Sequence, residues 1–149
     1  MQKIKFAKTR NVKSPDRGTP GSAGLDFYVP IDYKGPQHLK RGESALVPSG
    51  VRVSVPPGHA IIAFNKSGQA VKNGLQVGAC VVDEDYQGEV HLHVTNIGKP
   101  RAYLRPGDKL VQFLLMPVTY AAPQEVTIED LFQAKTKRGS GALGSTGTQ

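Results

Sequence analysis

The sequence predicts an all-β fold, a sandwich or a barrel, from three observations. Short runs alternate between apolar and polar side chains, 17 glycines and 11 prolines are spread between these runs, and helical patterns are scarce. Alternation with a period of two is typical of strands, and Gly and Pro are typical of the turns that join them. Many short strands at this spacing favour a sandwich or a barrel.

The strands and turns follow one another closely along the chain. In chain order we expect a turn at 34–36, a strand at 51–55, a turn at 56–58, strands at 60–64 and 90–94, a turn at 105–108 and a strand at 110–116. Helix is expected only in two short pieces. Ser67–Gly74 predicts two turns with Ser67 as the N-cap and Gly74 just after the last turn, and Thr127–Phe132 predicts another short piece.

The composition indicates one compact domain, which we place at residues 1–134, followed by a flexible glycine-rich arm at 135–149. With 38% hydrophobic residues and no Trp, the chain has a lean core of the kind that oligomerisation often reinforces. A single cysteine, Cys80, allows no internal disulfide. The sequence has no apolar run long enough to span a membrane and no signal peptide, so a cytoplasmic protein is expected.

The formal charge of +7 is concentrated at the two ends of the chain. Residues 1–20 carry six basic side chains and one acidic one, a net +5, and residues 135–138 carry +3, which leaves −1 for the rest. Two basic ends on a neutral body fit an anionic ligand that is held by terminal segments, and they fit non-specific contact with nucleic acid equally well.

Two segments are candidates for binding phosphate. After Arg138, glycines alternate with Ser and Thr, so that backbone N–H groups, hydroxyls and a guanidinium are available to an anion; a plain disordered terminus fits the same residues. Ser67, which follows Lys66, opens a short helix whose first N–H groups suit a phosphate oxygen, although an ordinary helix cap fits as well.

Asp83 is the candidate catalytic carboxylate. It lies where an apolar strand meets an acidic turn, and Tyr86 and a second strand follow, so a hairpin is expected with a carboxylate and an aromatic ring at one end. Such a carboxylate can orient a water molecule and accept its proton, whereas the alternative is a solvated turn. His91 and His93 share a strand face without a third metal ligand at sensible spacing, and Cys80 fits a small buried hydrophobe.

Taken in order, five segments resemble the five motifs of the trimeric dUTPase family over nearly the whole chain. They are Ala23–Asp26, Lys66–Ala70 with Lys72, Gly78–Glu89, Gly107–Gln112 and Arg138–Gly147. The resemblance implies a distorted jelly-roll subunit in a homotrimer with shared active sites. It also implies Mg²⁺-assisted hydrolysis of dUTP to dUMP and pyrophosphate.

The resemblance further assigns a role to individual residues. Asp83, helped by Gln112, would position the water that attacks the α-phosphorus, and Asp26 would hold the Mg²⁺–triphosphate through metal-bound waters. The substrate-binding residues it implies are Lys66, Ser67 and Gly68 on the phosphates; Tyr86 under the deoxyribose; Cys80, Val81, Val82 and His91 around the uracil; and Arg138, Leu143, Gly144, Ser145 and Thr146 in the closing arm.

The chain departs from the family pattern at three of these positions. Lys66 replaces Arg, Cys80 replaces Gly, and Leu143 replaces the Phe that stacks on the base, so weaker base capture with intact chemistry is expected. Alternative interpretations are a pyrophosphatase for a modified pyrimidine nucleotide, an enzyme related to dCTP deaminase, and a non-catalytic β-barrel that binds nucleic acid. No membrane and no specific nucleic acid are expected as partners.

Overall fold

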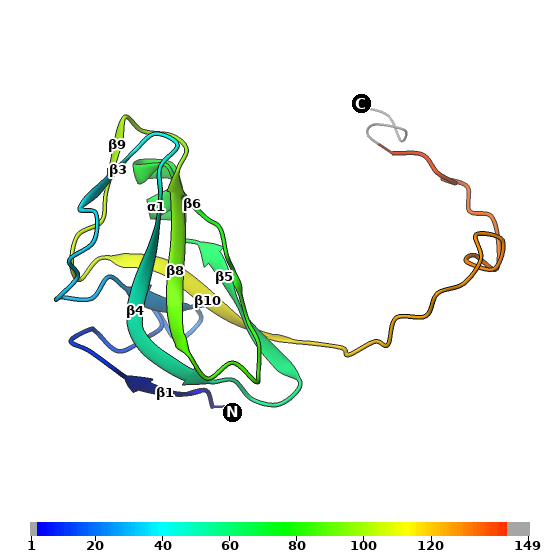
Figure 1. The fold of residues 1–149 in the computed structure, drawn as a ribbon, viewed down its shortest axis with the longest axis horizontal. Helices are drawn as coiled ribbons and strands as arrows, with labels where there is room; N and C mark the ends of the chain where they lie inside the picture. The colour runs from blue at the N-terminus through cyan, green and yellow to red at the C-terminus, as the bar shows by residue number, and fades with distance from the viewer. Residues whose placement is uncertain (1–2, 143–149) are drawn as a thin grey trace. The chain divides into compact units, whose positions relative to one another are not determined.

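The computed structural model describes residues 3–142 (Figure 1). The chain divides into a compact unit, Met1–Thr119, and a second unit, Tyr120–Gln149, and each is described by itself. All named elements lie in the first unit. They are β1 Lys5–Lys8, β2 Leu25–Tyr28, β3 His38–Lys40, β4 Ser44–Ser54, β5 His59–Asn65, α1 Ser67–Asn73, β6 Leu75–Val77, β7 Val81–Val82, β8 Glu89–Asn96, β9 Arg101–Tyr103 and β10 Lys109–Pro117.

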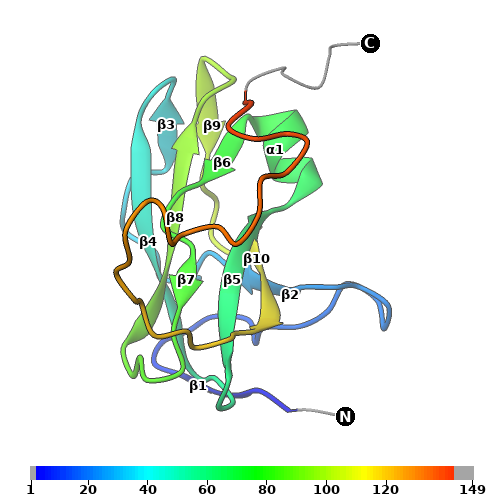
Figure 2. The same ribbon diagram turned by 90° about the vertical axis from the view of Figure 1, so that its right-hand side faces the viewer.

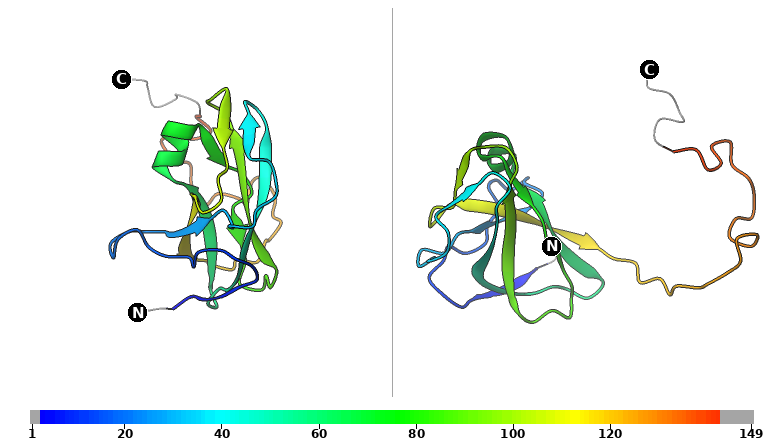
Figure 3. Two further views of the ribbon diagram at one scale, coloured as in Figure 1. Left: turned by 90° about the vertical axis from the view of Figure 1, so that its left-hand side faces the viewer. Right: turned by 45° about the horizontal axis from the view of Figure 1, so that its top comes forward.

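The strands of the first unit form two four-stranded sheets and one two-stranded sheet. The strand orders are β1-β4-β8-β6, β2-β10-β5-β7 and β3-β9, and all the strand pairs in them are antiparallel. Figure 2 shows β4 and β8 in one layer and β5 and β10 in the other. The left view of Figure 3 shows α1 and the β3–β9 pair at the same end of this unit.

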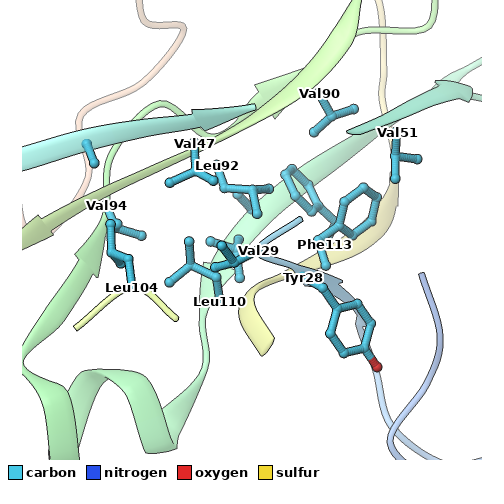
Figure 4. Packing of buried hydrophobic residues seen from close by; sticks show 14 of the residues in the cluster. Tyr28, Val29, Val47, Val51, Val90, Leu92, Val94, Leu104, Leu110 and Phe113 are labelled. Carbon is cyan, nitrogen blue, oxygen red and sulfur yellow. The ribbon is translucent and has the colours of Figure 1, made fainter. Parts of the chain in front are cut away.

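The core fills the space between the two large sheets. In Figure 4, Val47 and Leu92 project from β4 and β8 toward Leu110 and Phe113 of β10. Each of these four side chains is at most 2% exposed. Phe113 also packs against Phe27 of β2, with 4.7 Å between the ring centroids. Apolar side chains alternate along β4 and β8 because each strand has one face toward this core and one toward solvent.

The predicted all-β class is confirmed, and each of the four predicted strands coincides with an observed one. Three of the predicted segments lie entirely within an observed strand, namely 60–64 in β5, 90–94 in β8 and 110–116 in β10. The fourth, 51–55, overlaps the end of β4 and extends one residue beyond it. The predicted turns at 34–36, 56–58 and 105–108 connect strands, and Gly107 has a φ of 84° that favours glycine.

Two details of the helix prediction are wrong. The N-cap of α1 is Lys66 in an extended conformation, without a side-chain cap bond, so Ser67 is the first helical residue and not the cap. Gly74 follows the helix with a φ of 67°, as predicted. Thr127–Phe132 forms a turn, in which the Thr127 hydroxyl accepts from the Asp130 N–H at 3.2 Å. Its side chains are exposed, so no packing offsets the cost of starting a short helix.

Within residues 3–142, the structure contains no helix with the length and apolar character needed to cross a membrane. The placement of the arm boundary at residue 134 stays a prediction.

Candidate active site

Six of the predicted site residues converge on one cavity of about 180 Å³ between the β6–β7 loop, the hairpin after β7 and the start of β8. The cavity is lined by Leu46, Ala79, Cys80, Val81, Val82, Asp83, Tyr86, Val90, His91 and Phe113. We call it the hairpin pocket. Because Phe113 belongs to the core and Asp83 to the surface, the pocket has an apolar floor and an acidic rim.

A larger cavity of about 460 Å³ also has Leu46 in its lining. It is bordered by Arg10, Tyr33 and Lys34, and it contains no carboxylate and none of the predicted site residues. Volume alone therefore does not identify the site, and the convergence of chemically suitable groups favours the hairpin pocket.

The acidic side chains near the hairpin differ in what they contact. The Glu84 carboxylate accepts from the Gly58 N–H, and the Glu89 carboxylate accepts from the Gly50 N–H at 2.6 Å. These two carboxylates therefore tie the hairpin to the β4–β5 turn and to strand β4. The Asp83 carboxylate makes no hydrogen bond or ion pair within residues 3–142, and Asp83 is the one acidic residue among the described lining residues. It is thus free to interact with water or a ligand.

The Tyr86 ring is fixed at the rim of the pocket. Its hydroxyl donates to the Glu89 carbonyl at 2.9 Å, which bends the hairpin back toward β8. Gly88 makes this possible, because a Cβ at that position would lie 2.3 Å from the Tyr86 hydroxyl oxygen. The same Glu89 carbonyl accepts from His91 Nδ1 at 2.9 Å, so the neutral His91 ring carries its proton on Nδ1. Both side chains are thereby oriented by one backbone oxygen.

A second group of predicted residues lies at the start of α1 and on β2. The buried Asp26 carboxylate, 4% exposed, contacts Lys66 Nζ through one oxygen and Lys109 Nζ at 2.7 Å through the other. Asp16 lies beside them, 4.0 Å from Lys109, and accepts from the Tyr28 hydroxyl at 2.6 Å. In Figure 4 the Tyr28 hydroxyl accordingly points away from the core cluster.

The two lysines determine the ionisation of Asp26. Burial by itself would raise the pKa of this carboxyl, but the hydrogen bonds and charges of Lys109 and Lys66 outweigh burial, so the pKa lies below its ordinary value. The hydrogen bond to Asp26 correspondingly raises the pKa of Lys109. Burial raises the pKa of Tyr28, and its hydrogen bond to Asp16 adds to this shift. Asp26 is therefore a permanent negative charge at neutral pH.

Gln112 lies next to this group, opposite Asp26 in the pairing of β10 with β2. Its amide Nε2 donates to the Asn65 carbonyl at 2.8 Å, just before Lys66. Gly24 leaves room for it, since a Cβ there would lie 2.8 Å from Gln112 Oε1. Ser67 and Gly68 are exposed in the first turn of α1.

The two carboxylates Asp83 and Asp26 belong to opposite edges of one sheet. Asp83 follows the edge strand β7, whereas Asp26 lies in the edge strand β2, and β5 and β10 lie between them. Three strand spacings of about 4.8 Å separate the edges by roughly 14 Å. No described contact joins Asp83 to Asp26, Lys66 or Gln112. Within residues 3–142, the predicted site residues of one chain therefore fall into two separate groups.

The remaining predicted residues lie in the second unit of the chain. Arg138 is exposed and closes a local turn, with its Nε donating to the Gly141 carbonyl at 2.9 Å. Leu143, Gly144, Ser145 and Thr146 lie outside the described residues.

Comparison with known proteins places the chain in a family. The dUTPase family model matches residues 10–147. A deoxyuridine 5'-triphosphate nucleotidohydrolase of Paraburkholderia xenovorans is 39% identical over 148 residues, which cover 97% of this chain and 95% of the relative. The chain belongs to the dUTPase family. The predicted enzyme class, a dUTP diphosphatase, is confirmed with it.

Solved structures of dUTPases share the fold. A mutant of the dUTPase of Staphylococcus bacteriophage 80alpha, solved with dUpNHpp, superposes with a TM-score of 0.84 over 99% of both chains at 18% identity. The dUTPase of phage phi11 of S. aureus, for which the coordination of a structural Mg(II) ion is described, has a TM-score of 0.74 at 19% identity over 84% of this chain and 97% of its own. The predicted jelly-roll of the dUTPase type is therefore confirmed.

The dUTPase motifs did not identify every residue of the two groups. Leu46, Val90 and Phe113 line the hairpin pocket, and Lys109 contacts Asp26, yet none was singled out from the sequence. No signal in the sequence marks Leu46, and only the structure shows that this apolar side chain of β4 is 58% exposed. Lys109 stands inside the fourth motif, but its contact with Asp26 depends on the pairing of β2 with β10.

Proposed function

We propose that the chain hydrolyses dUTP to dUMP and pyrophosphate, with Asp83 positioning the water that attacks the α-phosphorus. The observation that carries the proposal is the position of the Asp83 carboxylate on the rim of the hairpin pocket, where no group of residues 3–142 contacts its oxygens. A carboxylate that keeps its acceptor sites free can hold a water molecule and take up its proton.

The walls of the pocket support a pyrimidine as the bound base. Within the described residues no group accepts from the Cys80 N–H, which leaves a backbone donor for a base carbonyl. A fixed backbone donor or acceptor rejects a base with the opposite pattern, because the mismatched groups stay buried and unpaired. The Tyr86 ring is held at the rim by its hydroxyl, and this position supports a contact with the sugar. We assign Cys80, Val81, Val82 and His91 to base recognition and Tyr86 to the deoxyribose.

The second group supports binding of the triphosphate. Lys66, Ser67 and Gly68 supply an ammonium, a hydroxyl and backbone N–H groups at the start of α1. Gln112, anchored to the Asn65 carbonyl, lies against the same group, and we propose that it assists Asp83 from there. Arg138, Leu143, Gly144, Ser145 and Thr146 would complete the site when the arm closes.

Mg²⁺ fits this group as an ion carried by the phosphates. No cluster of three metal-ligating side chains occurs within residues 3–142, and both Asp26 oxygens are in contact with lysines. Mg²⁺ commonly keeps several waters and takes its other ligands from substrate phosphates, so one ionised carboxylate can hold it through water. The ion would offset charge on the phosphates, while Asp26 orients the metal-bound waters.

The separation of the two groups supports an active site that is shared between copies of the chain. Asp83, on the rim of the hairpin pocket, and Asp26 lie at opposite edges of one sheet, roughly 14 Å apart. Attack at the α-phosphorus requires the water on Asp83 and the groups that bind the phosphates to lie within a few ångströms of one phosphorus atom. A second chain whose Asp26 edge faces the hairpin pocket would meet this requirement, as in the homotrimer that we propose.

The catalytic role is tested by Asp83→Asn, with Asp85→Asn as the matched control in the same turn. Pyrophosphate release is measured with dUTP, dCTP, dTTP and UTP, and binding is measured with dUMP. We expect release from dUTP alone, a loss of about 10²–10⁴ in kcat for Asp83→Asn with dUMP binding retained, and a nearly unchanged control. Full activity in Asp83→Asn would remove Asp83 from the mechanism, and ammonia from dCTP would point to a deaminase.

Sharing of the site is tested by mixing two impaired variants, Asp83→Asn and Gln112→Ala, after joint refolding. If each site takes Asp83 from one chain and Gln112 from another, some sites in mixed trimers contain neither substitution, and activity exceeds the sum of the separate variants. Activity equal to that sum, or a monomer by light scattering, would place the whole site in one chain.

A further inference from the structure

Two residues in the lining of the hairpin pocket, Ala79 and Cys80, belong together with Gly78 to a loop that we call the wall, and the backbone of this loop is held from both sheets. The carbonyl of His93 in β8 accepts from the Gly78 N–H at 3.0 Å, and His93 Nδ1 accepts from the Ala79 N–H at 3.0 Å. From the opposite sheet, the Ala63 N–H of β5 donates to the Cys80 carbonyl at 2.7 Å. Three consecutive residues of the wall are thus fixed by hydrogen bonds.

The bond from Ala79 specifies the state of the His93 ring. A backbone N–H can only donate, so Nδ1 must be unprotonated and the neutral ring carries its proton on Nε2. His91, two residues earlier, has the opposite arrangement because its Nδ1 faces a carbonyl. The two histidines of this strand therefore have different roles. His91 lines the pocket, whereas His93 lies behind the wall.

The wall approaches the His93 ring so closely that residue 78 must lack a side chain. A Cβ on Gly78 would lie 2.0 Å from Nδ1 and 2.5 Å from Cε1 of His93. The ring is half-buried, and it fills the space beside Gly78 while bonding to the next residue. Packing and hydrogen bonding therefore act on the same short segment.

We infer that His93 is a positioning residue for the pyrimidine, because its ring fixes the position of the Ala79 and Cys80 backbone against which the base would bind. This inference rests on the proposed function of the hairpin pocket. His93 touches no reacting group, so its ring affects the capture of dUTP and leaves the attack on the phosphorus unchanged.

The kinetic test compares three variants of the full-length chain. His93→Leu keeps a side chain of moderate size and removes the acceptor, His93→Asn returns an acceptor near the position of Nδ1, and His38→Leu is a control on β3, where His38 faces Tyr103. We expect KM for dUTP to rise about fivefold in His93→Leu with kcat within about twofold, as the loss of one neutral hydrogen bond predicts. His93→Asn and His38→Leu should stay near the wild type.

A second readout does not depend on turnover. In His93→Leu the Ala79 amide should exchange its hydrogen about tenfold faster by NMR, and His93→Asn should restore protection. Unchanged KM and unchanged Ala79 exchange in His93→Leu would overturn the inference, and so would a rise in KM that His93→Asn shares in full. If the wild type fails to hydrolyse dUTP, the proposed function fails, and the exchange of Ala79 alone then decides whether His93 holds the wall.

Discussion

Asp26 and Lys109, on the paired strands β2 and β10, are joined by a contact of 2.7 Å between Asp26 Oδ2 and Lys109 Nζ. Lys66 contacts the other carboxylate oxygen, so two cations share one buried anion. The arrangement holds two ammonium groups against one buried carboxylate, and one of these groups, on Lys66, belongs to the start of α1. An incoming triphosphate would compete with Asp26 for Lys66, and it would meet a site that is already ordered.

Replacing Asp26 should make the free energy of unfolding less dependent on pH in the acidic range. The pKa of Asp26 is lower in the folded chain than its ordinary value of 3.8, so the unfolded chain binds more protons in that range and stability rises with pH. The contribution is complete above this value and is lost as the pH falls below it. Asp26→Asn should therefore cost about 1.5–3 kcal/mol at pH 7 and less near pH 3.

Urea denaturation of wild type and Asp26→Asn at the two pH values and at one protein concentration measures this difference. Asp32→Asn is a suitable control, because Asp32 forms an exposed ion pair with Arg10 at 3.2 Å and such pairs contribute little. A cost for Asp26→Asn that is the same at pH 3 and pH 7 would contradict the role of the ionised carboxylate.

Gly78→Ala should destabilise the chain in a way that depends on His93. The added Cβ would lie 2.0 Å from His93 Nδ1, and displacing the ring should cost about 1–3 kcal/mol. In a His93→Ala background the same substitution should cost clearly less. The four unfolding free energies form a double-mutant cycle, and additive costs would show that Gly78 and His93 do not interact.

Glu84→Ala should loosen the hairpin that carries Asp83. Its carboxylate accepts from the Gly58 N–H in the β4–β5 turn, and Glu84 is exposed, so the loss should be about 1 kcal/mol in stability. We expect a drop of about three- to tenfold in kcat/KM for dUTP, because a mobile hairpin holds the water less well. Asp85→Ala, the next residue in the turn, should leave both quantities unchanged. Equal effects of the two substitutions would indicate a general charge effect.

Leu143→Phe should lower KM for dUTP. The resemblance to the family places an aromatic side chain over the uracil at this position, and stacking contributes roughly 1 kcal/mol, which corresponds to about fivefold in KM. Steady-state kinetics of this variant and of Leu143→Ala measure the effect of the side chain. An unchanged or higher KM in Leu143→Phe would contradict the prediction.

The strands could be predicted because alternation and turn residues are local signals. Val90–Val94 and Leu110–Met116 carry their burial pattern in the sequence itself, and β8 and β10 were placed correctly from it. The N-cap of α1 was misplaced by one residue, because the serine signal at Ser67 is local whereas the chain enters the helix through an extended Lys66.

Contacts between distant residues were beyond sequence reasoning. The pairing of Asp26 with Lys109 depends on the register of β2 and β10, and the contact of Ala79 with His93 depends on a loop that folds back onto β8. At neither place does a local sequence pattern indicate which distant residue is contacted. The pocket residue Leu46 is likewise brought there by β4, which pairs it with His93.

The hydrogen bonds at Gly78, Ala79 and Cys80 attach one wall of the pocket to both large sheets, and Phe113 of the core forms part of its lining. The clearance available to a base is therefore set by how far apart the sheets stand, which the interior packing determines. Substitutions that enlarge or reduce core side chains, at positions away from the pocket, should change which pyrimidines bind. If the pocket receives the base as we propose, discrimination against the thymine methyl is a property of the whole sandwich.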